Sequence, residues 1–433
     1  MLSPKSAETV RATLPAVSGS LSEITTLFYE KLFVAHPELL RHLFNRGNQA
    51  NGSQRQALAG AVAAFAGHLT EHPDSRPDTM LTRIAHKHAS LGVRADQYPI
   101  VREHLFAAIA EVLGEAVTDE VVRAWDEVYW LMAHALIAVE KRLSAEAGVA
   151  EDGLWRPYRV AARVEETDEV ATFLLRPADG APVPPARPGQ YVSVQVQLPD
   201  GARQIRQYSL SGQSDGGLQI SVKRVAAGGR PGAPSDDPAG EVSGYLHAHV
   251  HGGETLHVSP PFGDVVLDDG DGPLLLASAG IGCTPMVGML AHLAAAGSRR
   301  RIIAAHADRS PATHPFRTDL RRLTDKLTDA TTELWYEEGV RYEDGFRYED
   351  GGRHQEAVRH GEERAEAETG GAADPVTVRT GRMDLTQIVV PAGTTAYLCG
   401  PVPFMKAARA QLLASGVPAS HLHYEVFGPD LGL

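Results

Sequence analysis

The stretch Arg206-Gln207-Tyr208-Ser209 stands in a part of the chain where apolar and polar residues alternate. A period of two is clear in Tyr191-Val192-Ser193-Val194-Gln195-Val196 and again in Leu218-Gln219-Ile220-Ser221-Val222. Clusters of proline and glycine separate such runs, which is typical of short strands joined by turns. From about residue 156 onward the pattern therefore predicts an antiparallel sheet or barrel, with residues 206–209 at the end of one strand.

Three chemical groups meet in this stretch: a guanidinium, an aromatic ring and a hydroxyl. The Tyr208 ring can pack on a flavin, the Ser209 hydroxyl can bond a heteroatom of the flavin ring, and Arg206 can neutralise a pyrophosphate. Pro188-Gly189-Gln190-Tyr191 supplies another expected flavin neighbour, and Gly240-Glu241-Val242-Ser243 can turn backbone N–H groups toward phosphate. An Arg-x-Tyr-Ser unit at a strand end is typical of flavin-binding barrels, so a flavin is the expected cofactor; the alternative for the unit alone is an ordinary strand end.

After the barrel pattern, strand and helix patterns follow one another. Leu274-Leu275-Leu276-Ala277 predicts a buried strand, residues 284–296 a helix, and Arg301-Ile302-Ile303-Ala304-Ala305 the next strand, so a parallel sheet is expected. Gly280-Ile281-Gly282-Cys283-Thr284-Pro285 lies where the first strand meets the helix, and its glycines and the helix N-terminus suit a phosphate. Cys399-Gly400-Pro401 also follows a predicted strand. The two motifs together predict a nicotinamide site.

Before the barrel, residues 1–147 repeat apolar side chains at helical spacing. Ile84 and His88 share one face of a predicted helix, and Tyr98 stands at the start of another. Glu140 falls on the apolar stripe of the last helix, where a carboxylate needs a partner. A histidine whose second ring nitrogen donates to a carboxylate is a more basic and better oriented ligand, as haem iron requires. The alternative for His88 is a hydrogen-bonded core residue.

Two more polar residues lie near these apolar stripes. Tyr29 lies at the edge of the first stripe, and Gln54 opens the second. Each can donate a hydrogen bond to oxygen bound at an iron. Their alternatives stay open at this point: Tyr29 as an ordinary core aromatic, and Gln54 as a helix-cap or surface amide.

Composition narrows the class of protein. The net charge is −13 and no stripe of Lys and Arg is present, which argues against binding to nucleic acid or to an anionic membrane. Residues 1–30 lack the layout of a signal peptide and no apolar run is long enough to span a bilayer, so we expect a cytoplasmic protein. The two cysteines exclude a disulfide framework and a cysteine-rich metal site. Residues 226–240 and 338–375 are expected to be solvated insertions, the longer one disordered.

Segments of the helical part resemble the globin domain of bacterial flavohaemoglobins. They are Phe28-Tyr29-Glu30, Leu43-Phe44-Asn45, Asn51-Gly52-Ser53-Gln54-Arg55, Ile84-Ala85-His86-Lys87-His88 and Asp96-Gln97-Tyr98. The resemblance implies that His88 is the proximal haem ligand, supported by Glu140 and Tyr98. It also implies contacts around the haem and on its distal side from Tyr29, Phe44, Gln54 and Leu58.

The remainder resembles the ferredoxin–NADP reductase family, specifically the reductase half of flavohaemoglobins, over all but the two insertions. The residues that carry this resemblance are the motifs above together with Tyr424-Glu425-Val426-Phe427-Gly428-Pro429. The resemblance implies FAD contacts from Tyr191, Arg206, Tyr208 and Ser209. It further implies that residues 280–285 and 399–401 form the nicotinamide site, and that Glu425 and Phe427 lie beside the flavin ring.

The expected architecture is multidomain. An all-α globin domain is expected over residues 1–147, an antiparallel β-barrel FAD domain over 155–268, and an α/β NAD(P) domain with a parallel sheet over 272–433. The resemblance implies haem b, FAD and NADH or NADPH as cofactors, and a nitric oxide dioxygenase that converts NO and O2 to nitrate. We separately expect a monomer.

Three alternatives to this activity remain open. They are a haem-based oxygen carrier or sensor with an attached flavin reductase, a flavin reductase whose helical part binds no haem, and a reductase that acts on peroxides. The sequence does not decide between NADH and NADPH, because Arg309 can meet a 2′-phosphate or merely solvent.

Overall fold

The structure is a computed structural model that describes residues 2–149, 153–214, 216–228, 238–338 and 376–428. The chain forms two compact units, one containing Met1–Glu165, Glu169–Leu267 and Val426–Leu433, the other containing Glu166–Asp168 and Asp268–Glu425. Almost all of the expected insertion at 338–375, and the centre of the one at 226–240, lie outside the described residues. Among the described residues, no helix is both long and apolar enough to cross a lipid bilayer.

The first part of the chain is helical, as predicted. Its helices are α1 (Pro4–Ala35), α2 (Pro37–His42), α3 (Arg46–Ala50), α4 (Ser53–Glu71), α5 (Asp78–Leu91), α6 (Tyr98–Leu113) and α7 (Asp119–Glu146). The apolar stripes of α1, α4 and α7 meet in one core that includes Phe28, Phe65 and Leu136. Burial of these stripes is the main force that holds the helices together.

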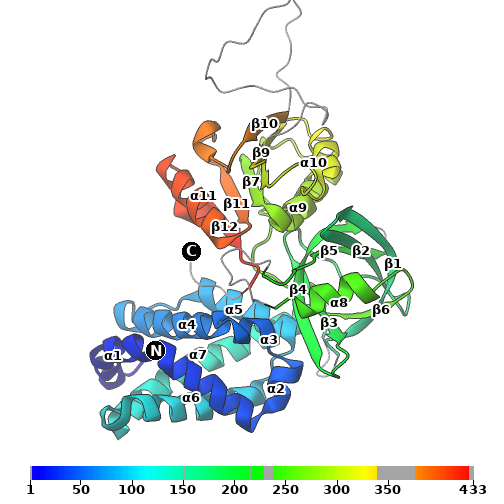
Figure 1. Ribbon diagram of the computed structural model, residues 1–433. Helices are drawn as coiled ribbons and strands as arrows, with labels where there is room; N and C mark the ends of the chain where they lie inside the picture. Colours follow the sequence, from blue (N-terminus) through cyan, green and yellow to red (C-terminus); the bar gives the residue numbers. More distant parts are fainter. Residues whose placement is uncertain (1, 150–152, 215, 229–237, 339–375, 429–433) are drawn as a thin grey trace, which may run out of the picture. The chain divides into compact units, whose positions relative to one another are not determined.

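In the described part of the chain, six strands close an antiparallel barrel in the order β1-β2-β5-β4-β3-β6. They are β1 (Arg156–Thr167), β2 (Val170–Pro177), β3 (Tyr191–Gln197), β4 (Arg203–Ser214), β5 (Gly217–Lys223) and β6 (Thr255–Val258). Alternate side chains such as Val192, Val194 and Ile220 fill the interior. Helix α8 (Glu241–His249) packs beside β4 and β5 (Figure 1). The predicted barrel is confirmed.

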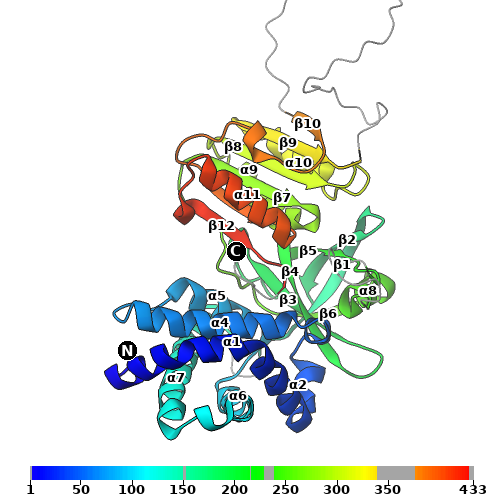
Figure 2. The same ribbon diagram turned by 60° about the vertical axis from the view of Figure 1, so that its left-hand side comes forward.

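The second unit contains a parallel sheet in the order β10-β9-β8-β7-β11-β12. Its strands are β7 (Leu274–Ala279), β8 (Ile302–Asp308), β9 (Ala330–Tyr336), β10 (Val376–Thr380), β11 (Thr395–Cys399) and β12 (Leu422–Glu425). Helices α9 (Cys283–Ala295) and α10 (Arg317–Thr324) cover one face, and α11 (Val402–Ala414) covers the other (Figures 1 and 2). This arrangement follows from right-handed crossovers that leave β7 and β11 in opposite directions.

Strands β7 and β11 are therefore the place where the strand order reverses. Leu274 to Ala277 of β7 pair in parallel with Thr395 to Leu398 of β11. In open parallel sheets, nucleotides bind beyond the carboxyl ends of the two strands at such a reversal. Both motifs that predict a nicotinamide site, residues 280–285 and 399–401, begin at these two strand ends.

Candidate functional site

A histidine–carboxylate–phenol cluster occupies the helical part, with its carboxylate and phenol buried and its histidine partly exposed. The Nδ1 atom of His88 lies 2.8 Å from Oε1 of Glu140 and 3.1 Å from the hydroxyl of Tyr98. The same hydroxyl donates to Oε1 of Glu140 at 2.6 Å. Glu140 is only 6% exposed, so these two hydrogen bonds supply the partners that a buried carboxylate needs. The structure thus brings together three residues that the sequence predicted would act as a set.

Local sequence explains why these side chains converge. His88 lies in the last turn of α5, which ends at Gly92 in a left-handed conformation (φ 76°), as helix C-termini commonly do. Tyr98 is the first residue of α6 and is followed by Pro99. The backbone carbonyl of Tyr98 accepts a hydrogen bond from the Tyr129 hydroxyl at 2.7 Å. Burial raises the pKa of Tyr98, and the nearby Glu140 carboxylate raises it further. Tyr98 is therefore a permanent proton donor to Glu140 at neutral pH.

The Nε2 atom of His88 is the nitrogen that would have to bind a haem iron. Within the described residues, no hydrogen bond engages Nε2 of His88, whereas Nδ1 is held by Glu140. Apolar residues nearby in the core, including Ile84, are only half-buried. A histidine with one nitrogen fixed by a carboxylate and the other unengaged has the donor chemistry of a proximal iron ligand. The residues present therefore fit a haem held at His88.

Tyr29 and its neighbours form a second group in the helical part. Tyr29 is 5% exposed, and its ring meets that of Phe44 edge-on at 5.8 Å between centroids. Burial raises the pKa of Tyr29, while the nearby amides of Gln54 and Gln49 oppose that rise. Gln54 therefore lies close enough to Tyr29 to influence its hydroxyl.

Gln49 and Leu58 complete the description of this group. Gln49 was missed by the sequence reasoning, because one polar residue in the short helix α3 carries no distinguishing pattern. Leu58 is half-buried and packs against the helical core.

The predicted flavin residues lie together on β3 and β4. Ser209 is 4% exposed and pairs in register with Tyr191. Burial raises the pKa of Tyr208, although Arg206 acts against this. The Nε2 atom of Gln207 donates to the hydroxyl of Ser193 at 3.4 Å. Residues 206–209 lie inside β4 (Arg203–Ser214), so the prediction that they stand at the end of a strand is wrong.

The start of α8 suits a phosphate through its backbone. Within the described residues, the N–H groups of Glu241, Val242 and Ser243 have no hydrogen-bond acceptor, since the first helical bond runs from Gly244 N–H to Gly240. Such N–H groups at a helix start favour an anion. The Ser243 hydroxyl is turned inward, where it accepts from Val225 N–H at 3.2 Å. Val242 is fully buried, so both residues would act through their backbone alone.

The two nicotinamide motifs are in direct contact. A Cβ atom on Gly282 would lie 2.2 Å from the carbonyl oxygen of Cys399, so only glycine is accommodated there. Gly280 and Gly400 have φ angles of 54° and 157°, which favour glycine. Cys283, Thr284 and Pro285 are buried in the first turn of α9. The three glycines leave no side chains at this point, so a dinucleotide can approach the backbone closely.

The last predicted site residues come from the end of the chain. Glu425 closes β12 and pairs in register with Cys399, whose pKa is raised by burial and by Glu425. Phe427 is 47% exposed. Lys87 of α5 donates to the carbonyl of Gly428, which anchors the segment that contains Phe427 to the helical part.

Comparison with known proteins agrees with this arrangement. The globin family profile matches residues 26–136, and the profile of the oxidoreductase NAD-binding domain matches residues 276–410. A flavohemoprotein from Bordetella parapertussis is 41% identical over 437 residues, covering 99% of each chain. A flavohemoprotein from Chromobacterium violaceum is 40% identical and covers 100% of each chain.

Solved structures give the same result. A flavohemoglobin from Malassezia yamatoensis with bound FAD and haem has a TM-score of 0.82 at 32% identity, covering 99% of this chain and 100% of that one. The FAD/NAD-binding domain of a nitric oxide dioxygenase from Vibrio cholerae has a TM-score of 0.51 at 33% identity, covering 64% of this chain and 100% of that one. The chain described here therefore belongs to the flavohemoprotein family.

Proposed function

We propose that this protein is a nitric oxide dioxygenase, in which NO and O2 become nitrate with electrons from NAD(P)H. The observation that carries the proposal is the contact of His88 Nδ1 with the buried Glu140 carboxylate at 2.8 Å. A relative that carries the name nitric oxide dioxygenase, from Vibrio cholerae, supports the choice of substrate. We place the haem in residues 1–147, FAD in 155–268 and the nicotinamide cofactor in 272–433.

When bound, haem would supply the iron at which the gases react, and FAD would turn a hydride into single electrons. His88 would hold the iron through Nε2. Glu140 accepts a hydrogen bond from Nδ1 and so fixes the tautomer and raises the basicity of the imidazole. Tyr98 donates to the same carboxylate oxygen and holds it in place. These contacts favour an electron-rich ligand, which suits oxygen activation better than storage.

Tyr29 is the residue we expect to contact a small oxygen-containing ligand. Because burial raises its pKa, the phenol keeps its proton at neutral pH and can donate a hydrogen bond. The amide of Gln54 acts on the same hydroxyl. Such a donor stabilises negative charge that develops on oxygen, and it would slow oxygen release, which a carrier needs to be fast.

In the reductase part, Arg206 and the α8 start would bind the FAD phosphates, with Tyr191, Tyr208 and Ser209 at the flavin ring. Residues 280–285 and 399–401 would orient the nicotinamide. Glu425 and Phe427 are proposed to lie beside the flavin. The negative net charge and the absence of a basic stripe in the sequence support small molecules as the partners. We also propose a monomer that works in the cytoplasm.

An absorbance spectrum of the purified protein, followed by an NO electrode, tests the proposal. We expect a Soret band beside flavin bands, and NO consumption that yields nitrate. Flavin bands without a Soret band would instead indicate a flavin reductase whose helical part binds no haem. A Soret band with reversible oxygen binding but no nitrate would leave a carrier or sensor, and peroxide reduction faster than NO consumption would leave a peroxide-directed reductase.

A further inference from the structure

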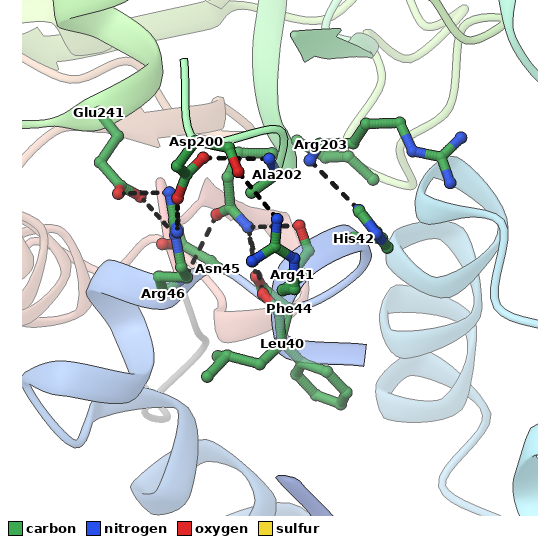
Figure 3. A network of polar contacts seen from close by, with 12 residues as sticks. Leu40, Arg41, His42, Phe44, Asn45, Arg46, Asp200, Ala202, Arg203 and Glu241 are labelled. Atoms are coloured by element: carbon green, nitrogen blue, oxygen red, sulfur yellow. Dashed lines mark hydrogen bonds and ion pairs between the residues drawn. The ribbon is translucent and has the colours of Figure 1, made fainter. Parts of the chain in front are cut away.

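Gln204 joins the helical part to the barrel through its buried amide. It lies in β4 and is 1% exposed. Its Nε2 atom donates toward the backbone carbonyls of Leu40 (3.2 Å), Arg41 (3.3 Å) and Phe44 (3.3 Å). Figure 3 labels Leu40, Arg41 and Phe44, the residues whose carbonyls accept these bonds. The last carbonyls of a helix have no partner inside the helix, so this barrel side chain supplies a donor to the carbonyls of Leu40 and Arg41 at the end of α2.

The oxygen of the same amide accepts hydrogen bonds from two arginines. Its Oε1 atom accepts from the backbone N–H of Arg46 at 3.3 Å and from the guanidinium of Arg206 at 3.3 Å. We name residues 40–46 the haem-side corner, because Phe44 is proposed to pack on the haem. One buried amide thus contacts both the haem-side corner and the arginine that we assign to the flavin phosphates.

Ion pairs of Arg46 strengthen the same junction. Its guanidinium contacts Asp200 at 2.6 Å and Glu241 at 2.7 Å (Figure 3). Glu241 opens α8, whose start is the proposed phosphate site. Arg41 also donates to the carbonyl of Asp200 at 2.8 Å. The Arg46 side chain is about three-quarters buried, with 26% exposed, so these contacts are better shielded from salt than surface pairs.

The Phe44 ring contacts two aromatic rings of α1. It meets Phe33 edge-on at 5.3 Å and Tyr29 at 5.8 Å between ring centroids. The ring is therefore fixed by α1, while its backbone carbonyl is fixed by Gln204. Loss of the Gln204 amide would release the backbone of the haem-side corner from β4 and leave the aromatic contacts intact.

We infer that Gln204 is a positioning residue for electron transfer, which holds the haem-side corner and the flavin-binding strand β4 at a fixed separation. The inference rests on the proposed function, since it needs FAD at β4 and haem beside Phe44. NAD(P)H delivers two electrons with its hydride and becomes NAD(P)⁺. Iron accepts one electron at a time, passing from Fe(III) to Fe(II), so each hydride supports two transfers across this junction.

The test is anaerobic stopped-flow reduction of the full-length holoprotein by NADH, comparing the parent with Gln204→Leu. Flavin bleaching reports hydride transfer, and the shift of the Soret band reports haem reduction. We expect flavin reduction within twofold of the parent and haem reduction slower by about 10-fold or more, because small misplacements of reacting groups have effects of this size. Gln197→Leu is the matched control, because Gln197 is an exposed residue of β3.

Hydrogen exchange supplies a measurement that does not depend on activity. Because Arg46 N–H donates to Gln204 Oε1, amides of residues 43–48 should exchange faster in Gln204→Leu and at the parent rate in Gln197→Leu. Should Gln204→Leu lose a cofactor, Gln204→Glu replaces it. That variant keeps the acceptor for Arg46 N–H but removes the donors to the three carbonyls, and the same slow haem reduction is expected.

Two results would overturn the inference. Haem reduction at the parental rate in a variant whose amides exchange faster would show that the junction does not control electron transfer. Equal slowing of flavin and haem reduction would show a general structural role. Neither result depends on NO, so a parent that passes electrons to haem but makes no nitrate would contradict the proposed function while leaving Gln204 testable.

Discussion

Replacement of Glu140 by glutamine tests the role of the carboxylate behind His88. The change keeps the shape of the side chain and one oxygen that accepts hydrogen bonds, and it removes the negative charge. Two hydrogen bonds are affected, from Tyr98 at 2.6 Å and from His88 at 2.8 Å. Both lengths are in the range of charge-assisted bonds.

The size of the effect follows from these two contacts. A hydrogen bond to a charged group contributes about 1.5–3 kcal/mol and a neutral one about 0.5–1.5 kcal/mol. Removal of the charge should therefore cost about 1 kcal/mol per bond, or about 2 kcal/mol in all. Since about 1.4 kcal/mol corresponds to tenfold, we expect turnover to fall by about 10- to 100-fold, as is typical for the partners of metal ligands.

The assay is NO consumption with NADH and oxygen, normalised to haem content. Haem should remain bound in Glu140→Gln, because His88 is still present, and the iron–histidine stretching frequency should fall as the imidazole becomes less basic. Glu146→Gln is the matched control on the same helix, since Glu146 is 65% exposed and pairs only with Arg142 among the described residues. Unchanged NO consumption in the haem-loaded Glu140 variant would refute the role of the carboxylate.

Three further changes have expected outcomes. Tyr29→Phe removes the buried hydroxyl, so oxygen should dissociate about 10-fold faster in flash photolysis; an unchanged rate would exclude Tyr29 as a donor. Gly282→Ala places a Cβ atom 2.2 Å from a backbone oxygen, so reduction of the flavin by NADH should slow while reduction by dithionite does not; equal rates with NADH would contradict the site. His314 has its pKa lowered well below 6.5, chiefly by burial and then by His306. A base with a depressed folded pKa stabilises the fold above 6.5 and loses that contribution as the pH falls, by about 1.4 kcal/mol per pH unit. His314→Gln, measured by thermal unfolding between pH 6.5 and 5, should flatten this dependence, and an identical slope would contradict it.

Particular residues show how far the sequence leads. Local pattern singled out His88 and Glu140 as polar groups on apolar stripes and Tyr98 as a helix start, but it was the resemblance to flavohaemoglobins that joined them into one set, and the structure shows that their side chains meet. The barrel was predictable because apolar and polar residues alternate with a period of two. The parallel sheet was predictable because strand and helix patterns follow one another. Gly282 was recognisable as part of a motif, but its contact with the Cys399 carbonyl depends on β7 and β11 being neighbours.

Gln204 and Gln49 were not predictable, for a physical reason. The contact of Gln204 with the Phe44 carbonyl joins residues 160 positions apart. No periodicity links such positions, and a glutamine in a strand reads as any polar residue would. The role of an amide is set by which carbonyls the tertiary fold brings to it, so residues that join two packed parts of a chain become visible only in the structure.

The most direct measurement counts electrons against product. Under air, with NO supplied at a known rate, NAD(P)H oxidation and nitrate formation are followed in the same vessel. Two NO, two O2 and one NAD(P)H balance to two nitrate ions, one NAD(P)⁺ and one proton, so we expect two nitrate ions for each NAD(P)H and none in His88→Ala. Steady NAD(P)H oxidation without nitrate, or nitrate formation that persists in His88→Ala, would contradict the proposed reaction at this site.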